Sequence, residues 1–133
     1  MKTVELCGVQ LDYAVATLEG YSNLRMNPHR FAPVLIMDPP NKKYGVVQLA
    51  DLDYSSAWGL AGPIIEREKI TISPNDSKSY IGQEPWTAYR VALLFTDEGE
   101  KEYMHGHTPL IAAMRCYVAS KMGDEINLPE ELS

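Results

Sequence analysis

The stretch 108-TPLIAAMRCYVASKMG-123 is the clearest helix in the sequence and decides the fold. Thr108 is a good N-cap residue, Pro109 suits the first helical position, and Gly123 is well placed to end the helix. At helical spacing the stretch presents two apolar faces, one of large and one of small side chains: Leu110, Met114, Tyr117 and Val118, and Ala112, Cys116 and Ala119. A helix that is apolar on two sides is buried on two sides. The sequence therefore predicts a central helix with other elements packed on both faces.

A second amphipathic helix is predicted over 9–20, because apolar residues recur at i, i+3, i+4 and i+7 and Gly20 ends the pattern. Buried or alternating apolar runs predict strands at 31–37, 69–73 and 86–95, and a short strand or extended segment at 45–52.

The remaining segments are predicted from turn residues. Segment 21–30 contains Asn-Pro and predicts a loop, and 126–133 predicts an edge strand broken by Pro129. Together the elements predict one α+β domain over residues 1–133. Its architecture would be an α/β/α sandwich, with a small, mainly antiparallel sheet that has helices on both faces.

The segment 54-YSSAWGLAGPIIERE-68 has an unusual composition for a connection. Ser55 or Ser56 can cap a helical segment that continues through Trp58. The glycines that follow loosen this segment, and Pro63 suits the first position of a second short helix over 63–68.

The composition is that of an ordinary globular protein: 133 residues, 45% of them hydrophobic, with a formal net charge of −6. The negative charge argues against binding to long nucleic acid or to an anionic membrane, because either needs a positive field. It leaves room for a small anion in a local pocket. No apolar run predicts a membrane span or a signal peptide, and the two cysteines are expected to be free thiols. We therefore expect a cytosolic protein.

Three segments, 3–21, 54–68 and 106–125, with an isolated Trp86 between the last two, carry a family resemblance. In this order they resemble the NinX-like family of small phage proteins and, more distantly, the phage ABA sandwich domains. The resemblance implies a phage or prophage origin, a location in the bacterial host cytoplasm, and an α/β/α sandwich. It implies no activity, because the family is one of unknown function.

The chain departs from this resemblance at Ala57, where the family pattern leads us to expect an aspartate. If that aspartate were catalytic, this protein would be inactive. If the segment binds through serine, tryptophan and backbone amides, the change would be tolerated.

No catalytic set is visible in the sequence. Cys116 lies in the middle of a helix on the small face, where inert packing is expected. His105 and His107 have no nearby Cys or carboxylate pattern to complete a metal site. Glu66 and Glu68 point to different sides of a helix and form no acid/base pair. We therefore predict a non-enzymatic protein without a metal or cofactor.

Several residues instead suit a small-molecule site. The helix starts at Gly62-Pro63 and Thr108-Pro109 leave backbone N–H groups for a small anion. Hydroxyls, arginine forks and aromatic rings can add hydrogen bonds, charge and stacking. The predicted ligand-binding residues are Tyr54, Ser55, Ser56, Trp58, Arg67, Trp86, Thr108 and Arg115.

One of these residues, Arg115, also has a structural interpretation, which stands beside the ligand-binding one. Arg115 lies between the two apolar faces of its helix and needs a buried carboxylate, and Glu66 is the candidate. On this interpretation 62–68 is a structural clamp, and the Glu66–Arg115 pair can also line the floor of the pocket.

The residues and the resemblance together give two functional hypotheses. In the first, the protein sequesters a small anionic nucleotide-like molecule, for which a host anti-phage defence signal is our candidate. In the second, its Tyr-rich, acidic surface docks on a host or phage protein and inhibits it, and a homo-oligomer is compatible with either. A hydrolase of small nucleotides is the weakest alternative, because no base or metal set supports turnover.

Overall fold

The structure is a computed structural model, and it describes residues 1–28, 33–41, 45–75, 84–90 and 103–133. The α-helices of this part are α1 (Gly8–Leu18), α2 (Trp58–Glu68) and α3 (Pro109–Met122). The strands are β1 (Ser22–Asn27), β2 (Val34–Asp38), β3 (Val47–Gln48), β4 (Ile70–Pro74), β5 (Trp86–Arg90) and β6 (Met104–Gly106). Short 3-10 turns lie at η1 (Thr3–Glu5), η2 (Leu49–Asp51) and η6 (Glu130–Leu132).

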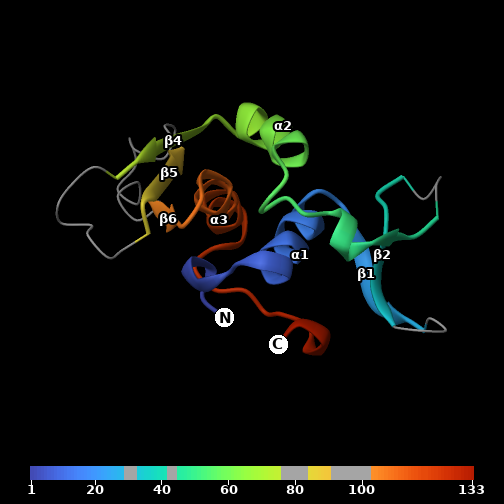
Figure 1. The fold of residues 1–133 in the computed structure, drawn as a ribbon. Coiled ribbons are helices and arrows are strands. Elements are labelled where there is room, and N and C mark those ends of the chain that lie inside the picture. The colour runs from blue at the N-terminus through green and yellow to red at the C-terminus, as the bar shows by residue number, and fades with distance from the viewer. Residues whose placement is uncertain (29–32, 42–44, 76–83, 91–102) are drawn as a thin grey trace.

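The strands form two antiparallel three-stranded sheets, in the orders β1-β2-β3 and β4-β5-β6. The sheets lie at opposite ends of the molecule with the three helices between them (Figure 1). The predicted α+β class with antiparallel pairing is confirmed. The strands are divided between two sheets, however, where one sheet between helix layers was expected.

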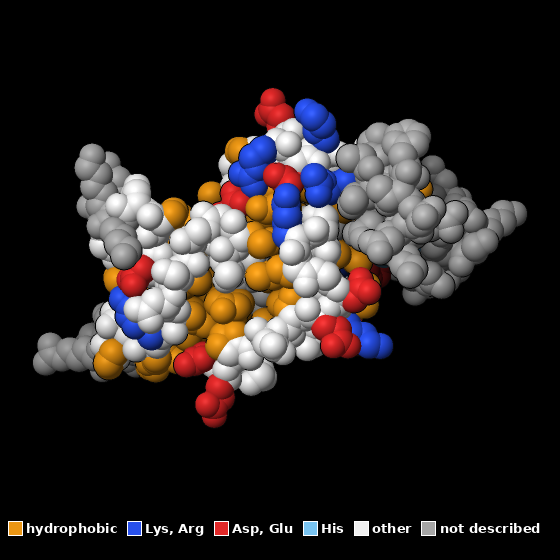
Figure 2. All heavy atoms as spheres, turned by 180° about the vertical axis from the view of Figure 1, so that it is seen from behind, with side chains coloured by type: hydrophobic (Ala, Val, Ile, Leu, Met, Phe, Trp, Pro, Cys, Tyr) orange, Lys and Arg blue, Asp and Glu red, His pale blue; other side chains and the backbone are white. Residues whose placement is uncertain are grey.

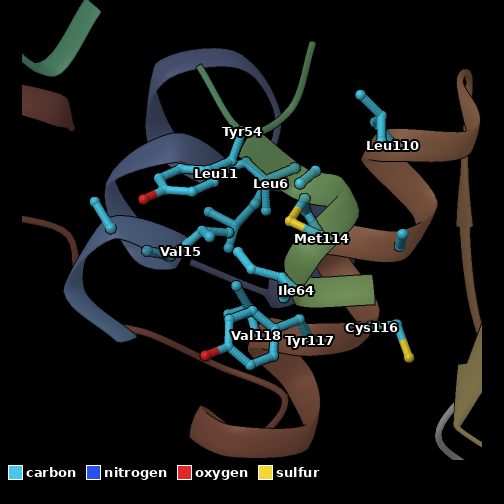
Figure 3. Close-up of a cluster of buried hydrophobic side chains, with 14 of the residues drawn as sticks. Leu6, Leu11, Val15, Tyr54, Ile64, Leu110, Met114, Cys116, Tyr117 and Val118 are labelled. Carbon is cyan, nitrogen blue, oxygen red and sulfur yellow. The ribbon is translucent and has the colours of Figure 1, made fainter. Parts of the chain in front are cut away.

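The central element is α3, as its two apolar faces predict. Its large face packs against α1 and α2, where Leu6, Leu11, Val15 and Ile64 meet Met114 and Val118 (Figure 3). Cys116 points away from this cluster, toward the β4-β5-β6 sheet (Figure 3). The predicted N-cap is also present, because the Thr108 side chain accepts a hydrogen bond from the N–H of Ile111 at 3.1 Å.

The small face of α3 allows an unusually close approach of the sheet. A Cβ added at Gly106 in β6 would lie 2.5 Å from the backbone nitrogen of Ala112. Only glycine fits there without a shift of the strand or the helix. The close contact fixes β6 against the first turn of α3 and so positions the beginning of that helix.

Helix α2 is continuous, which corrects the prediction of two segments divided at Pro63. Pro63 is the sixth residue of α2, so its ring faces the carbonyl of Gly59, where a helix interior normally excludes proline. Gly62 relieves one of the clashes, because a residue before proline is restricted chiefly through its Cβ.

Two further predictions need correction. The segment predicted as a loop contains β1, and the tail predicted as an edge strand forms η6 instead. His105 belongs to β6. Residues 91–95 of the predicted strand 86–95 lie outside the described residues, as do 29–32, which include His29.

The guanidinium group of Arg115 is buried, with 4% of the residue exposed, and joins three distant parts of the chain. Its Nε donates to the carbonyl of Leu6 at 2.7 Å. One terminal nitrogen donates to the carbonyl of His105 at 2.8 Å and to Oε2 of Glu84 at 2.6 Å. Glu66 is exposed on α2, so the predicted Glu66–Arg115 clamp is wrong and Glu84 is the carboxylate that neutralises Arg115.

We predict that Arg115→Met lowers the free energy of unfolding by about 3–5 kcal/mol, because the buried carbonyls and Glu84 lose their donor. Glu66→Ala should change it by less than about 0.5 kcal/mol, as expected for an exposed position. Urea denaturation followed by circular dichroism measures both values. A large loss of stability in both variants would restore the clamp.

Candidate functional site

A cavity of about 380 Å³ gathers four of the predicted ligand-binding residues on one surface. They are Ser55, Ser56, Trp58 and Thr108. The cavity is completed by residues that the sequence did not single out as ligand contacts: Gly8, Pro109, Leu110 and Ile111. Residues from three separate parts of the chain therefore meet here.

The cavity lies where three α-helices begin. Gly8 and Trp58 are the first residues of α1 and α2, and Thr108 and Pro109 are the N-cap and first residue of α3. The N-caps of α1 and α2, Cys7 and Ala57, make no side-chain capping bond, so the first N–H groups of these helices lack that partner. Each helix N-terminus carries about half a positive charge, and three of them around one cavity favour an anionic group.

The serines reach the cavity because Asp12 of α1 holds their turn. The N–H of Ser55 donates to the buried carboxylate of Asp12 at 2.8 Å, and the Ser56 hydroxyl donates to Asp53 at 3.2 Å. Burial raises the pKa of Asp12, and the hydrogen bonds from Ser55 partly oppose this rise. The carboxylates of Asp12 and Asp53 are therefore both hydrogen-bonded to the turn that contains the two serines.

Tyr54, in the same turn, is a core residue. Its ring packs beside Leu11 in the cluster between the helices (Figure 3). Burial raises the pKa of its hydroxyl to about 12, with smaller effects of nearby charges. The structure therefore separates Tyr54 from the cavity-lining residues.

The two tryptophans have different surroundings. Trp58 lines the cavity and is 57% exposed, so the core does not require its ring. Trp86 belongs to β5, is partly buried against the hydrophobic core, and is paired with Gly106. Only Trp58 is placed to stack on a ligand in this cavity.

Arg67 is engaged in an ion-pair network away from the cavity. It binds both carboxylate oxygens of Glu19, at 3.1 and 2.8 Å, and donates to the Tyr117 hydroxyl and to Glu68, each at 3.0 Å. Basic and acidic side chains gather at this edge of the molecule in Figure 2. Burial alone would raise the pKa of Glu19, but hydrogen bonds from Arg67 and Tyr117 outweigh it and lower the pKa.

With Arg67 and Arg115 elsewhere, no Lys or Arg is among the described residues that line the cavity. The positive potential there comes from helix N-termini. Gly8 has a signal that sequence analysis could have used, since it directly precedes the helical pattern. Its φ of 54° is a left-handed value that glycine adopts without a Cβ clash.

The described ranges contain neither a metal-binding cluster nor a helix that could span a membrane. No three His, Cys, Asp or Glu side chains there are grouped so that they could hold a metal ion. No helix in the same ranges has the length and apolar character needed to cross a membrane. Cys7 is exposed, Cys116 is buried, and the two cysteines form no disulfide bond.

The fold is that of a small α+β protein, and its candidate site includes the backbone N–H groups at the N-termini of three helices. A family model described as Bacteriophage P22, NinX matches residues 2–121, and the chain belongs to that family. The resemblance found in the sequence is thereby confirmed, and the chain is a phage accessory protein. A search of the curated proteins finds no match.

The position of Ala57 generates a stability prediction. Because Ala57 is the N-cap of α2 and provides no capping atom, Ala57→Asp should raise the free energy of unfolding by about 1 kcal/mol. Ala57→Asn supplies a similar acceptor without the charge and should stabilise by a similar amount. Urea denaturation of the three proteins measures the effect, and destabilisation by both variants would contradict this N-cap assignment.

The Glu19 network generates a pH prediction. Because the pKa of Glu19 is lowered by folding, its pairing stabilises the protein above the ordinary value of 4.5, and this stabilisation is lost as the pH falls. Glu19→Gln should therefore cost about 1 kcal/mol at neutral pH and progressively less in acid.

Urea denaturation across the pH range measures the difference in unfolding free energy between the wild type and Glu19→Gln. Glu66→Gln is the matched control, because Glu66 is exposed and forms no salt bridge within the described residues. A Glu19→Gln deficit that grows in acid would show that the sign of the pKa shift is wrong.

Proposed function

We propose that the cavity at the three helix N-termini binds a small molecule with an anionic group and a planar ring. The proposal rests on one observation. A single cavity at the beginnings of α1, α2 and α3 is lined by Ser55, Ser56, Trp58 and Thr108. Orphan N–H groups suit a phosphate or carboxylate, and the exposed Trp58 ring suits stacking on a base. A nucleotide-like molecule combines these two features.

The proposal extends to how the phage would use such a site. Binding without turnover would remove the molecule from its receptor, so the protein would act in the host cytoplasm by sequestration. A host anti-phage defence signal is the candidate ligand, because nucleotides that carry such signals are small anions with planar bases. The protein's net charge of −6 favours a small anion over a long polyanion, which feels the whole negative field.

A protein partner is the second candidate, and a specific observation favours it. A neighbouring hollow of about 340 Å³ is lined mainly by apolar residues of β1, β2, η2 and α1, including Val9 and Met26. Val9 and Met26 are exposed, as is Trp58 of the first cavity. Hydrophobic side chains are also exposed near the centre of the face seen in Figure 2. Apolar surface of this kind marks protein docking sites.

The first test is to purify the protein from bacteria with active defence systems, denature it by heat, and analyse the supernatant by mass spectrometry. We expect a nucleotide in stoichiometric amount from the wild type and none from Trp58→Ala. Because Trp58 is largely exposed, the variant should retain its free energy of unfolding within about 0.5 kcal/mol. Val46→Ala, which shortens an exposed apolar side chain that does not line this cavity, is the control.

The charge of the ligand is tested with the two Ala57 variants, which differ by one charge beside the cavity. Ala57→Asp should bind the released nucleotide roughly fivefold more weakly than Ala57→Asn, because like charges at the helix start repel. Equal affinities would show that the site does not select an anion. An empty supernatant from every protein would instead favour protein docking, to be pursued with a pull-down from host lysate.

A further inference from the structure

A second cavity, of about 400 Å³, lies on the face of the β4-β5-β6 sheet that is turned away from α3. Alternation along the strands directs Ile70, Ala88 and Met104 to the α3 side, where they are buried. The register places Ser73, Thr87 and His105 in one row across the three strands on the other side. Asn75 and a pair of tyrosines complete the cavity: Tyr89 and Tyr103.

A chain of hydrogen bonds orders the polar part of this cavity. The side-chain amide of Asn75 donates to the carbonyl of Glu84 at 3.1 Å, so its oxygen faces the Thr87 hydroxyl, which donates to it. Nδ1 of His105 lies 3.0 Å from the Thr87 oxygen and 3.4 Å from the side-chain nitrogen of Asn75. The imidazole is therefore held in place by two side chains of the cavity.

The same chain is closed through Arg115, because Arg115 donates both to the Glu84 carboxylate and to the His105 carbonyl. Thr87 is itself buried, so its hydroxyl is held by protein partners. A polar surface whose groups are all held in this way is preorganised for a ligand, since little ordering is left for binding.

The tyrosines supply the apolar part of the cavity. The Tyr89 and Tyr103 rings lie with their centroids 5.1 Å apart and inclined at 50°. Tyr103 is 40% exposed, although burying its ring would have stabilised the fold. Exposed aromatic rings beside hydroxyl, amide and imidazole groups suit a ring with one apolar face and a hydroxylated edge.

The lining also specifies the charge of the ligand. None of the described lining residues is Lys, Arg, Asp or Glu, in contrast to the many charges elsewhere on this protein. Among the described lining residues, a charged ligand would find no opposite charge to offset its lost hydration. We propose that this cavity is a second binding site, and that it takes a neutral ring that carries hydroxyl groups. Free monosaccharides and the ribose of nucleosides share this chemistry.

The test is ligand-observed NMR by saturation transfer, with glucose, galactose and N-acetylglucosamine in one arm and adenosine and uridine in the other, each at millimolar concentration. Binding in the first arm alone identifies a sugar site, and binding confined to the second identifies a nucleoside site. We expect Tyr103→Leu to weaken the binding at least tenfold and Tyr103→Phe, which keeps the ring, to weaken it less than threefold. Val46→Ala, an exposed position that lines neither cavity, should bind as the wild type does.

The hydrogen-bond chain is tested with Thr87→Val, which removes the hydroxyl between Asn75 and His105 and should weaken ligand binding. The proposal is overturned if none of the five compounds binds, or if Tyr103→Leu binds as tightly as the wild type.

Discussion

The buried charge of Arg115 is the constraint on which the rest of the structure depends. A guanidinium group removed from water is tolerated only when its donors are satisfied, and here the partners are the carbonyls of Leu6 and His105 and the carboxylate of Glu84. Leu6 precedes the first residue of α1 by two positions, and His105 belongs to β6. One side chain of α3 therefore fixes the beginning of α1 on one side and the edge of a sheet on the other.

Both cavities follow from this arrangement. The first needs α1 and α3 to begin close together, which the Arg115–Leu6 bond and the tight contact at Gly106 enforce. The second needs His105 and Glu84 to be fixed relative to each other, because Asn75 and Thr87 complete a closed chain between them. A conventional apolar residue at position 115 could fill the space, but it could not hold either set of backbone groups.

Local signals in the sequence were sufficient for the parts of the fold that local physics decides. Thr108, Pro109 and Gly123 bound α3 as predicted, and the two apolar faces of α3 correctly predicted burial on both sides. Strand β1 was missed because its sequence is polar and both its ends are exposed, so it lacks the alternation of apolar residues that predicts a strand. Its pairing with β2 is what holds it in the sheet. The continuous α2 was missed because proline is normally a strong signal for a helix start.

The candidate site also has residues that local sequence signals identify and residues that they do not. Ser55, Ser56, Trp58 and Thr108 were found because they stand at helix starts, a position that sequence reveals. Arg67 and Arg115 were misplaced because their partners, Glu19 and Glu84, lie 48 and 31 residues away in the chain. Nothing local indicates which of many carboxylates a given arginine will meet, so the pairing is a property of the finished fold.

The ion pairs also explain why the positive potential at the first cavity comes from the backbone of helix N-termini. Carboxylates neutralise several cations of the described chain, including Arg25, Arg67, Arg90, Arg115 and Lys121. An acidic protein with its cations so engaged keeps a positive potential chiefly at its helix N-termini, where the field is short-ranged. Such a field reaches one or two anionic groups inside a cavity and fades before it can gather the phosphates of a long chain. The same physics applies to Ala57 at the beginning of α2: an N-cap without a capping side chain leaves more of the helix potential for a ligand than a capped one would.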